Sequence, residues 1–92
     1  MNVVRYYKNP ECNVCVSHLP QIEAMISQKF PELKLQVIDC TESPELCAQH
    51  SIFTVPVVEV VLDGQVIYRE ARIISLYKLE EAIQRPYEIL FE

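Results

Sequence analysis

The spacing of apolar residues divides the first half of the chain into two strands and a helix. Residues 2–7 (NVVRYY) are β-branched and aromatic, which predicts a short strand. Over residues 12–30 the apolar side chains recur every three or four positions, the period of an amphipathic helix. Pro20 lies inside this helix and should kink it, because proline lacks a backbone donor. Residues 33–39 (LKLQVID) alternate as a second strand, so this half predicts a right-handed βαβ unit with parallel strands.

The second half of the chain predicts a short helix followed by a hairpin. Residues 43–50 form the helix, with Ser43 as its N-cap. Residues 55–62 (VPVVEVVL) are strongly β-forming, and Asp63-Gly64 after them is a typical hairpin turn. Residues 65–70 are therefore expected to return antiparallel to the strand before them.

A last amphipathic helix is predicted over residues 74–84, and residues 85–92 are expected to extend past the fold. The order βαβαββα is that of an α/β domain with a four-stranded mixed sheet flanked by helices. No linker, repeat or low-complexity tract interrupts it, so residues 1–92 are interpreted as a single domain.

Composition and charge exclude several classes of function. The net charge is −5 and the eight Lys and Arg residues are scattered, which argues against a nucleic-acid-binding surface. No apolar run approaches the roughly 20 residues that a membrane-spanning helix needs. The chain begins directly with a strand rather than a basic and apolar leader. We therefore expect a soluble, cytoplasmic protein, and we expect it to be a monomer.

Cys12-Asn13-Val14-Cys15 lies where the first predicted strand meets its helix. A helix N-terminus presents unpaired N–H groups and partial positive charge, which favour a thiolate at the first cysteine. Cys15 lies one turn further on nearly the same face, within reach of a mixed disulfide formed at Cys12. Buried packing, or half of a zinc site, is the alternative interpretation of the same spacing, and the position at a strand–helix junction favours redox chemistry.

Thr54-Val55-Pro56 precedes the third predicted strand. Proline inside a strand usually marks an edge, yet five β-forming residues follow this one, so Pro56 lies at the entrance of the strand. Its peptide bond is either cis or an ordinary trans bond at a strand start, and the residues alone leave both open.

Together these motifs resemble the thioredoxin and glutaredoxin superfamily, in particular its short glutaredoxin-like thioredoxins. The resemblance rests on Tyr7-x-x-Pro10-x-Cys12-x-x-Cys15, on Thr54-Val55-Pro56 and on the order of the elements, and it covers roughly residues 2–84. It implies the thioredoxin fold and a cis bond at Pro56. It also implies that Cys12 is the nucleophile and Cys15 the resolving thiol. The substrate-binding residues that it implies are Tyr7, Asn13, Val14, Thr54, Val55, Pro56, Ala71 and Arg72.

Several positions depart from the family pattern. Tyr6 stands where thioredoxins bury an aspartate, and Glu11 stands where they carry a tryptophan. The Asn-Val pair between the cysteines is neither the Gly-Pro of thioredoxins nor the Pro-Tyr of glutaredoxins, so the redox poise cannot be inferred from it. Arg72 lies where thioredoxins place a glycine, and the Gly-Gly pair that admits glutathione in glutaredoxins is absent.

Cys40 and Cys47 do not repeat the CxxC spacing, so they do not complete a four-cysteine zinc site. We interpret them as unpaired, buried or half-buried thiols in preference to a regulatory disulfide. No metal and no cofactor is expected beyond the redox-active Cys12–Cys15 pair.

The resulting hypothesis is a dithiol–disulfide oxidoreductase that acts on disulfide-containing proteins or small disulfides. Its electron donor is expected to be a thioredoxin-reductase-type flavoprotein or glutathione. Two alternatives are a small copper carrier that binds metal through CxxC and a non-catalytic thioredoxin-fold adaptor. The copper carriers have a different element order and need no Val-Pro at a strand entrance, which weighs against the first of these.

Overall fold

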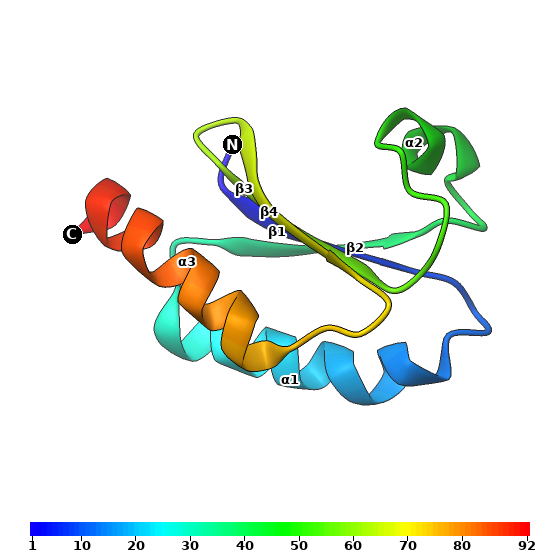
Figure 1. Cartoon of the computed structure of the whole chain (residues 1–92), viewed down its shortest axis with the longest axis horizontal. Coiled ribbons are helices and arrows are strands. Elements are labelled where there is room, and N and C mark those ends of the chain that lie inside the picture. The colour runs from blue at the N-terminus through cyan, green and yellow to red at the C-terminus, as the bar shows by residue number, and fades with distance from the viewer.

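A computed structural model describes residues 1–92 and contains the predicted sequence of elements. In chain order they are β1 (Val3–Lys8), α1 (Asn13–Lys29), β2 (Lys34–Asp39), α2 (Pro44–Gln49), β3 (Val57–Leu62), β4 (Gln65–Ala71) and α3 (Leu76–Phe91) (Figure 1). The order βαβαββα predicted from the periodicity is therefore confirmed.

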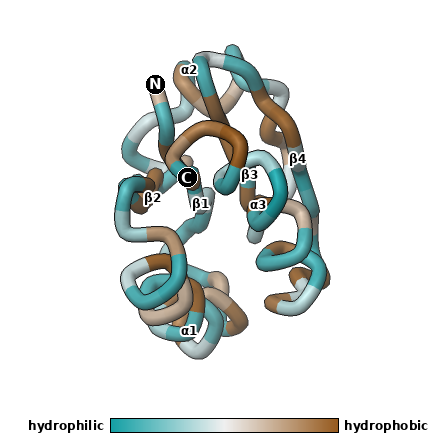
Figure 2. Tube along the Cα trace, turned by 90° about the vertical axis from the view of Figure 1, so that its left-hand side faces the viewer, coloured by the Kyte–Doolittle hydropathy of each residue, from teal (hydrophilic) through white to brown (hydrophobic).

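The four strands form one mixed sheet in the order β2-β1-β3-β4. β1 runs parallel to β2 and antiparallel to β3, and β3 pairs antiparallel with β4. Helices α1 and α3 cover one face of the sheet, and the short helix α2 lies on the other (Figures 1 and 2). The sheet thus separates the molecule into two unequal layers.

The larger core lies between the sheet and the pair α1 and α3. Val4 and Tyr6 point into it from β1, since alternate residues of a strand face the same side. The other members of this 14-residue cluster are Cys15, Ile22, Ile26, Phe30, Leu33, Val58, Val60, Leu62, Ile74, Leu79, Ile83 and Tyr87. Cys15 is thus part of the main core.

A smaller core lies on the opposite face, beneath α2. It comprises Tyr7, Ile38, Cys47, Ile52 and Val57. Tyr6 and Tyr7 are neighbours in β1, so they belong to different cores. This alternation assigns the two tyrosines to different chemical environments.

A polar row crosses the sheet on the α2 face. The strand register places Glu59 of β3 opposite Arg5 of β1 on one side and Arg69 of β4 on the other. Glu59 is only 1% exposed, and it is the one charged residue among the buried positions. Residues 55–62 were identified from the sequence as strongly β-forming, which does not reveal that Glu59 is buried.

The C-terminal segment differs from the prediction. We expected residues 85–92 to extend past the fold, but α3 continues through Pro86 to Phe91. Tyr87 is buried against Phe30, with ring centroids 5.1 Å apart, and its hydroxyl accepts a hydrogen bond from the backbone N–H of Glu32. This packing stabilises the last turns despite the donor that Pro86 lacks.

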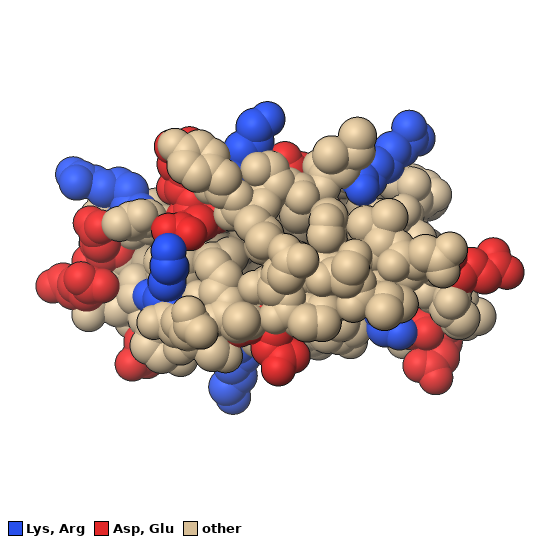
Figure 3. All heavy atoms as spheres, turned by 90° about the horizontal axis from the view of Figure 1, so that it is seen from below, with Lys and Arg blue, Asp and Glu red and all other residues tan.

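None of the helices combines the length and the apolar character needed to cross a membrane. Seen from the side of α1 (Figure 3), charged side chains lie mainly around the margin, and a broad uncharged area lies between them.

Candidate active site

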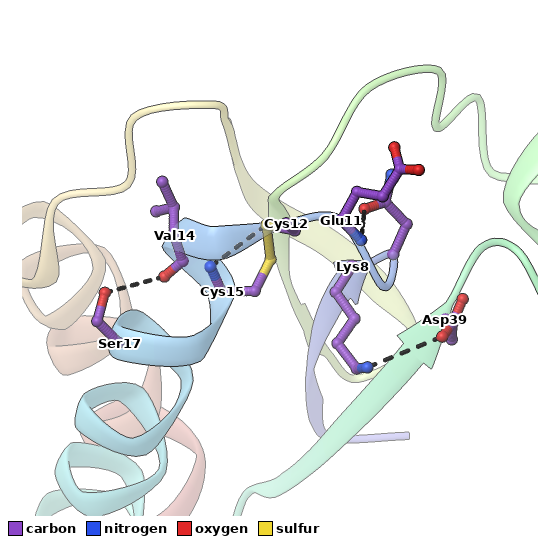
Figure 4. The surroundings of a disulfide bond; sticks show 8 residues. Lys8, Glu11, Cys12, Val14, Cys15, Ser17 and Asp39 are labelled. Carbon is purple, nitrogen blue, oxygen red and sulfur yellow. Dashed lines mark hydrogen bonds and ion pairs between the residues drawn. A yellow bond between two sulfur atoms is a disulfide. The ribbon is translucent and has the colours of Figure 1, made fainter.

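Cys12 and Cys15 form a disulfide where β1 connects to α1, and their Cα atoms are 5.3 Å apart (Figure 4). Cys12 is the N-cap of α1, and its Sγ accepts a hydrogen bond of 3.3 Å from the backbone N–H of Cys15. A side chain at this position faces the unpaired N–H groups and the positive end of the helix dipole. The geometry therefore favours negative charge on the Cys12 sulfur when the bond is reduced.

The two sulfur-bearing residues are unequally accessible. Cys12 is half-buried, whereas Cys15 is 3% exposed and packs in the main core. An incoming disulfide can reach Cys12 directly, and Cys15 is positioned to react only with a partner already bonded to Cys12. This asymmetry supports the order of reaction expected from the sequence.

The loop before Cys12 is fixed by its own hydrogen bonds. The Asn9 side-chain oxygen accepts from the backbone N–H of Glu11 at 3.0 Å, and the Asn9 carbonyl accepts from the N–H of Cys12 at 3.2 Å. Lys8, at the end of β1, forms an ion pair of 3.8 Å with Asp39 at the end of β2 (Figure 4). The turn thus sets Cys12 at the start of the helix, and Lys8 is directed to Asp39.

A hollow of about 540 Å³ opens beside the disulfide along α1. Its lining includes Lys8, Cys12, Cys15, Leu19 and Pro20. Cys15 is one of the residues that line this hollow, so the hollow brings solvent close to the resolving residue from the side of the helix. Proton exchange at Cys15 thus has a solvent route.

The Tyr6 hydroxyl is buried without a hydrogen-bond partner. Burial raises the pKa of Tyr6, so this side chain stays neutral. The position that carries a carboxylate in thioredoxins therefore supplies no charge to the core that contains Cys15.

The segment before β3 contains a cis peptide bond between Val55 and Pro56. The carbonyl of Pro56 accepts a hydrogen bond of 2.8 Å from the backbone N–H of Arg72, just after β4. Arg72 has a φ of 70°, in the left-handed region that favours glycine. The backbone at this position thus has a conformation typical of glycine, although the side chain is arginine.

The residues predicted to line a groove are exposed or half-buried, apart from Tyr7 and Pro56. Val14 is 45% exposed and points outward from the first turn of α1 (Figure 4). The strand register places Ala71 opposite Val57, next to Pro56. The exposed members are Asn13, Val14, Ala71 and Arg72, and the half-buried ones are Thr54 and Val55.

Tyr7 does not lie in this groove, and its predicted contact with substrate is wrong. Its side chain is fully buried on the α2 face, where its hydroxyl donates to Glu59 at 2.6 Å and lies 2.7 Å from Nδ1 of His50. Burial, together with the hydrogen bond and the charge of Glu59, raises the pKa of Tyr7. Tyr7 therefore serves the polar cluster rather than the disulfide.

The interpretation of Cys40 and Cys47 as unpaired thiols is also wrong, because they form a second disulfide with Cα atoms 5.8 Å apart. A turn at Asp39 brings them together. Its carbonyl accepts from the N–H groups of Glu42 and Ser43, and its side chain accepts from the N–H of Thr41. The signal for this turn was the Asp–Cys–Thr segment before the helix start at Ser43-Pro44.

Two exposed apolar side chains near the groove were not identified from the sequence. Phe53 is 84% exposed and Ile73 is 85% exposed, and each lies within three residues of a predicted groove position. Their only sequence signal is an apolar residue in a segment without helix or strand periodicity.

Comparison with known proteins places these features in context. The sequence pattern of the family described as Thioredoxin matches residues 1–85. The Thioredoxin-like protein YdfQ of Bacillus subtilis (strain 168) is 37% identical over 84 residues, which span 91% of this chain and 74% of that protein. The structure of thioredoxin 1 from Thermosipho africanus TCF52B superimposes with a TM-score of 0.86 at 33% identity, covering 98% of this chain and 99% of that one. Fasciola hepatica thioredoxin superimposes with a TM-score of 0.80 at 25% identity, covering 91% and 79%.

Proposed function

Since this chain belongs to the thioredoxin family, we propose that it is a dithiol–disulfide oxidoreductase in which Cys12 is the nucleophile and Cys15 the resolving thiol. The observation that carries the proposal is the position of Cys12, whose sulfur caps α1 and receives the N–H of Cys15. Thiol–disulfide exchange needs an accessible thiolate, and this geometry favours one at Cys12.

The reaction consists of two exchanges. The Cys12 thiolate attacks one sulfur of the substrate disulfide, and the other sulfur leaves as a thiolate that takes up a proton. Cys15 then loses its proton and attacks the Cys12 sulfur, which breaks the mixed disulfide and releases the second substrate thiol. Two electrons pass to the substrate, and the Cys12–Cys15 disulfide is the oxidised product.

The segment around Val55 is a suitable binding edge for an extended substrate. Neither the N–H nor the C=O of Val55 has a hydrogen-bond partner within the chain. A substrate strand can therefore pair with this backbone, as strand addition at an open edge does elsewhere. Asn13, Val14, Thr54, Pro56, Ala71 and Arg72 would surround the bound segment.

Trapping experiments test the assignment of the two cysteines. Cys15→Ser should accumulate a mixed disulfide between Cys12 and a disulfide substrate such as insulin, because the second exchange is blocked. Cys12→Ser should form no such adduct and should not reduce insulin. Trapping of the substrate on Cys15 in the Cys12→Ser protein, at a rate similar to that at Cys12, would reverse the roles.

Metal binding by the Cys12 and Cys15 pair, without any reductase activity, would favour the alternative of a copper carrier.

The proposed electron donor is a thioredoxin-reductase-type flavoprotein rather than glutathione. Val14 and Ala71 offer an exposed apolar surface near the disulfide, and the Gly-Gly pair associated with glutathione is absent. The test presents the oxidised protein separately to each donor and follows the Cys12–Cys15 bond. Rapid reduction by glutathione, with no turnover by the reductase, would change the donor assignment and leave the two-cysteine mechanism intact.

A further inference from the structure

In the second disulfide, as in the first, one cysteine is more accessible than the other. Cys40 is half-buried and borders a hollow of about 350 Å³, whereas Cys47 is 3% exposed. The other residues that line this hollow are Asn9, Ile52, Phe53, Thr54 and Val55, and none of them is charged. The hollow is within the size range of small-molecule sites, and one sulfur-bearing residue forms part of its wall.

We propose that Cys40–Cys47 is a second redox centre, which exchanges with low-molecular-weight thiols through Cys40 and determines how firmly the segment around Val55 is held. Access decides which sulfur of a disulfide is attacked, and here it favours Cys40. This centre is distinct from Cys12–Cys15 in both its elements and its hollow.

The exchange needs two equivalents of the small thiol. The first thiolate attacks the Cys40 sulfur, the Cys40–Cys47 bond breaks, and the electron pair leaves on the Cys47 sulfur, which takes up a proton. A second thiolate then attacks the small-thiol sulfur of the mixed disulfide and releases Cys40 as a thiol. The small thiol is oxidised to its disulfide, and the protein gains two electrons and two protons.

The second disulfide connects two segments that lead to the active site. The N–H of Cys40 donates to the carbonyl of Lys8, from which the chain continues to Cys12. Cys47 packs in the smaller core with Ile52, and its carbonyl accepts the N–H of Ile52 at 2.8 Å. Val55 packs against the same core. The covalent bond thus ties the end of β2 to the segment that carries Val55.

Helix α2 depends on this bond. It has six residues, and an isolated helix of that length is unstable in water. Without the disulfide, its contacts with the sheet are the packing of Cys47 and Leu46 and the hydrogen bonds that His50 makes with Tyr7 and Arg69. Reduction should therefore loosen α2 and the segment that follows it while leaving the main core intact.

The first experiment uses the full chain with Cys12→Ser and Cys15→Ser, so that only the second disulfide can react. The oxidised protein is incubated with reduced glutathione under native conditions, quenched with acid, alkylated and mapped by peptide mass spectrometry. We expect glutathione on Cys40 at early times and two alkylated thiols later. A bond that reacts only after urea is added, or glutathione found on Cys47, would overturn the proposal. Because the first pair is absent, this result does not depend on the proposed function.

The second experiment measures what reduction changes. In the same protein, hydrogen exchange should increase over residues 44–55 after reduction and stay unchanged in β1 and β3. Unchanged exchange over residues 44–55, or a loss of protection throughout the sheet, would show that the Cys40–Cys47 bond does not hold this segment in place.

The effect on activity rests on the proposed function and is measured with Cys12 and Cys15 intact. Cys40→Ala/Cys47→Ala should reduce insulin severalfold more slowly than wild-type protein in which Cys12 and Cys15 are reduced and the Cys40–Cys47 bond is intact, because insulin must pair with the backbone of Val55. A small aromatic disulfide, which needs no such pairing, should react at the wild-type rate and serves as the matched control. If the two proteins reduce insulin at equal rates, the Cys40–Cys47 bond does not determine how firmly the Val55 segment is held.

Discussion

Replacing Glu59 with alanine should destabilise the fold strongly, because this carboxylate is the centre of a buried polar cluster. Glu59 accepts a hydrogen bond of 2.6 Å from the Tyr7 hydroxyl and one of 2.9 Å from Nε of Arg69. Arg5 lies 3.6 Å away on the other side, and Glu59 itself is 1% exposed. The substitution leaves two arginines and a phenol around an empty site.

The expected loss follows from the burial of the partners. Removing one member of a buried ion pair costs about 3–5 kcal/mol. Here the lower end applies, since the Arg69 side chain is 40% exposed and can regain water. A loss of about 3 kcal/mol is a large share of a total stability of about 5–15 kcal/mol. For a domain of this size it corresponds to a decrease of about 12–24 °C in Tm.

Urea unfolding measures this difference against two matched variants. Glu59→Gln keeps the shape and an oxygen acceptor but removes the charge, so it should lose less than Glu59→Ala. Glu80→Ala removes a carboxylate whose ion pair with Lys29 is largely solvated, and such pairs contribute about 0.2–1 kcal/mol. If Glu59→Ala and Glu80→Ala lose the same free energy, the buried cluster does not stabilise the fold as argued.

The same cluster predicts the acid sensitivity of the protein. Burial alone would raise the pKa of Glu59, but the hydrogen bonds from Tyr7 and Arg69 and the charges of Arg69 and Arg5 lower it below the ordinary value of 4.5. The unfolded chain then binds this proton more tightly than the folded one. The stabilisation is complete above pH 4.5 and is lost as the pH falls through the folded-state pKa. Glu59→Gln should lack this loss, and an identical acid profile for the two proteins would refute the assignment.

Three further substitutions test separate features of the structure. Tyr6→Phe removes a buried hydroxyl without a partner and should raise the free energy of unfolding by about 1 kcal/mol in urea titrations. Ser75→Ala removes the oxygen that accepts the N–H of Lys78 at the start of α3, and should cost about 0.5–2 kcal/mol by the same measurement. Arg72→Gly relieves a left-handed backbone and should raise the free energy of unfolding by about 0.5–1 kcal/mol, once the greater freedom of glycine in the unfolded chain is subtracted. A sign opposite to the one given would reject each explanation.

The fold was predictable because its elements have clear periodicity, and the one large error concerns the C-terminus. The last helix was expected over residues 74–84, and residues 85–92 were expected to extend past the fold. In the structure α3 continues, because Tyr87 packs between Phe30 and Phe91 and bonds to the backbone of Glu32. Contacts between residues more than 50 positions apart decide this helix, and local propensity does not contain them.

The candidate site was predictable only where its chemistry is local. The spacing of Cys12 and Cys15 and their place at a strand–helix junction can be identified from the sequence. The pairing of Cys40 with Cys47 depends on the turn at Asp39, and the burial of Glu59 depends on the register that aligns Arg5, Glu59 and Arg69. The disulfide depends on the geometry of a turn, and the burial of Glu59 depends on the pairing of distant strands. The periodicity of the sequence specifies neither of these.

The alternation of β1 separates the buried charge of this protein from its disulfide. Tyr7 faces Glu59 beneath α2, whereas Tyr6 faces the main core, to which Cys15 belongs. The sheet lies between the carboxylate of Glu59 and the sulfur of Cys15. Tyr6, on the same side of the sheet as Cys15, is neutral. No buried carboxylate lies on the face of Cys15, so the acceptors for its proton lie in the hollow beside α1, which is open to water and is also lined by the exposed residue Glu23. It follows that Glu59→Gln should change the stability of the fold and leave the rate of the second exchange unchanged. Stopped-flow measurement of substrate release from the Cys12 mixed disulfide checks this, and a slower release in Glu59→Gln would show that the charge acts through the sheet.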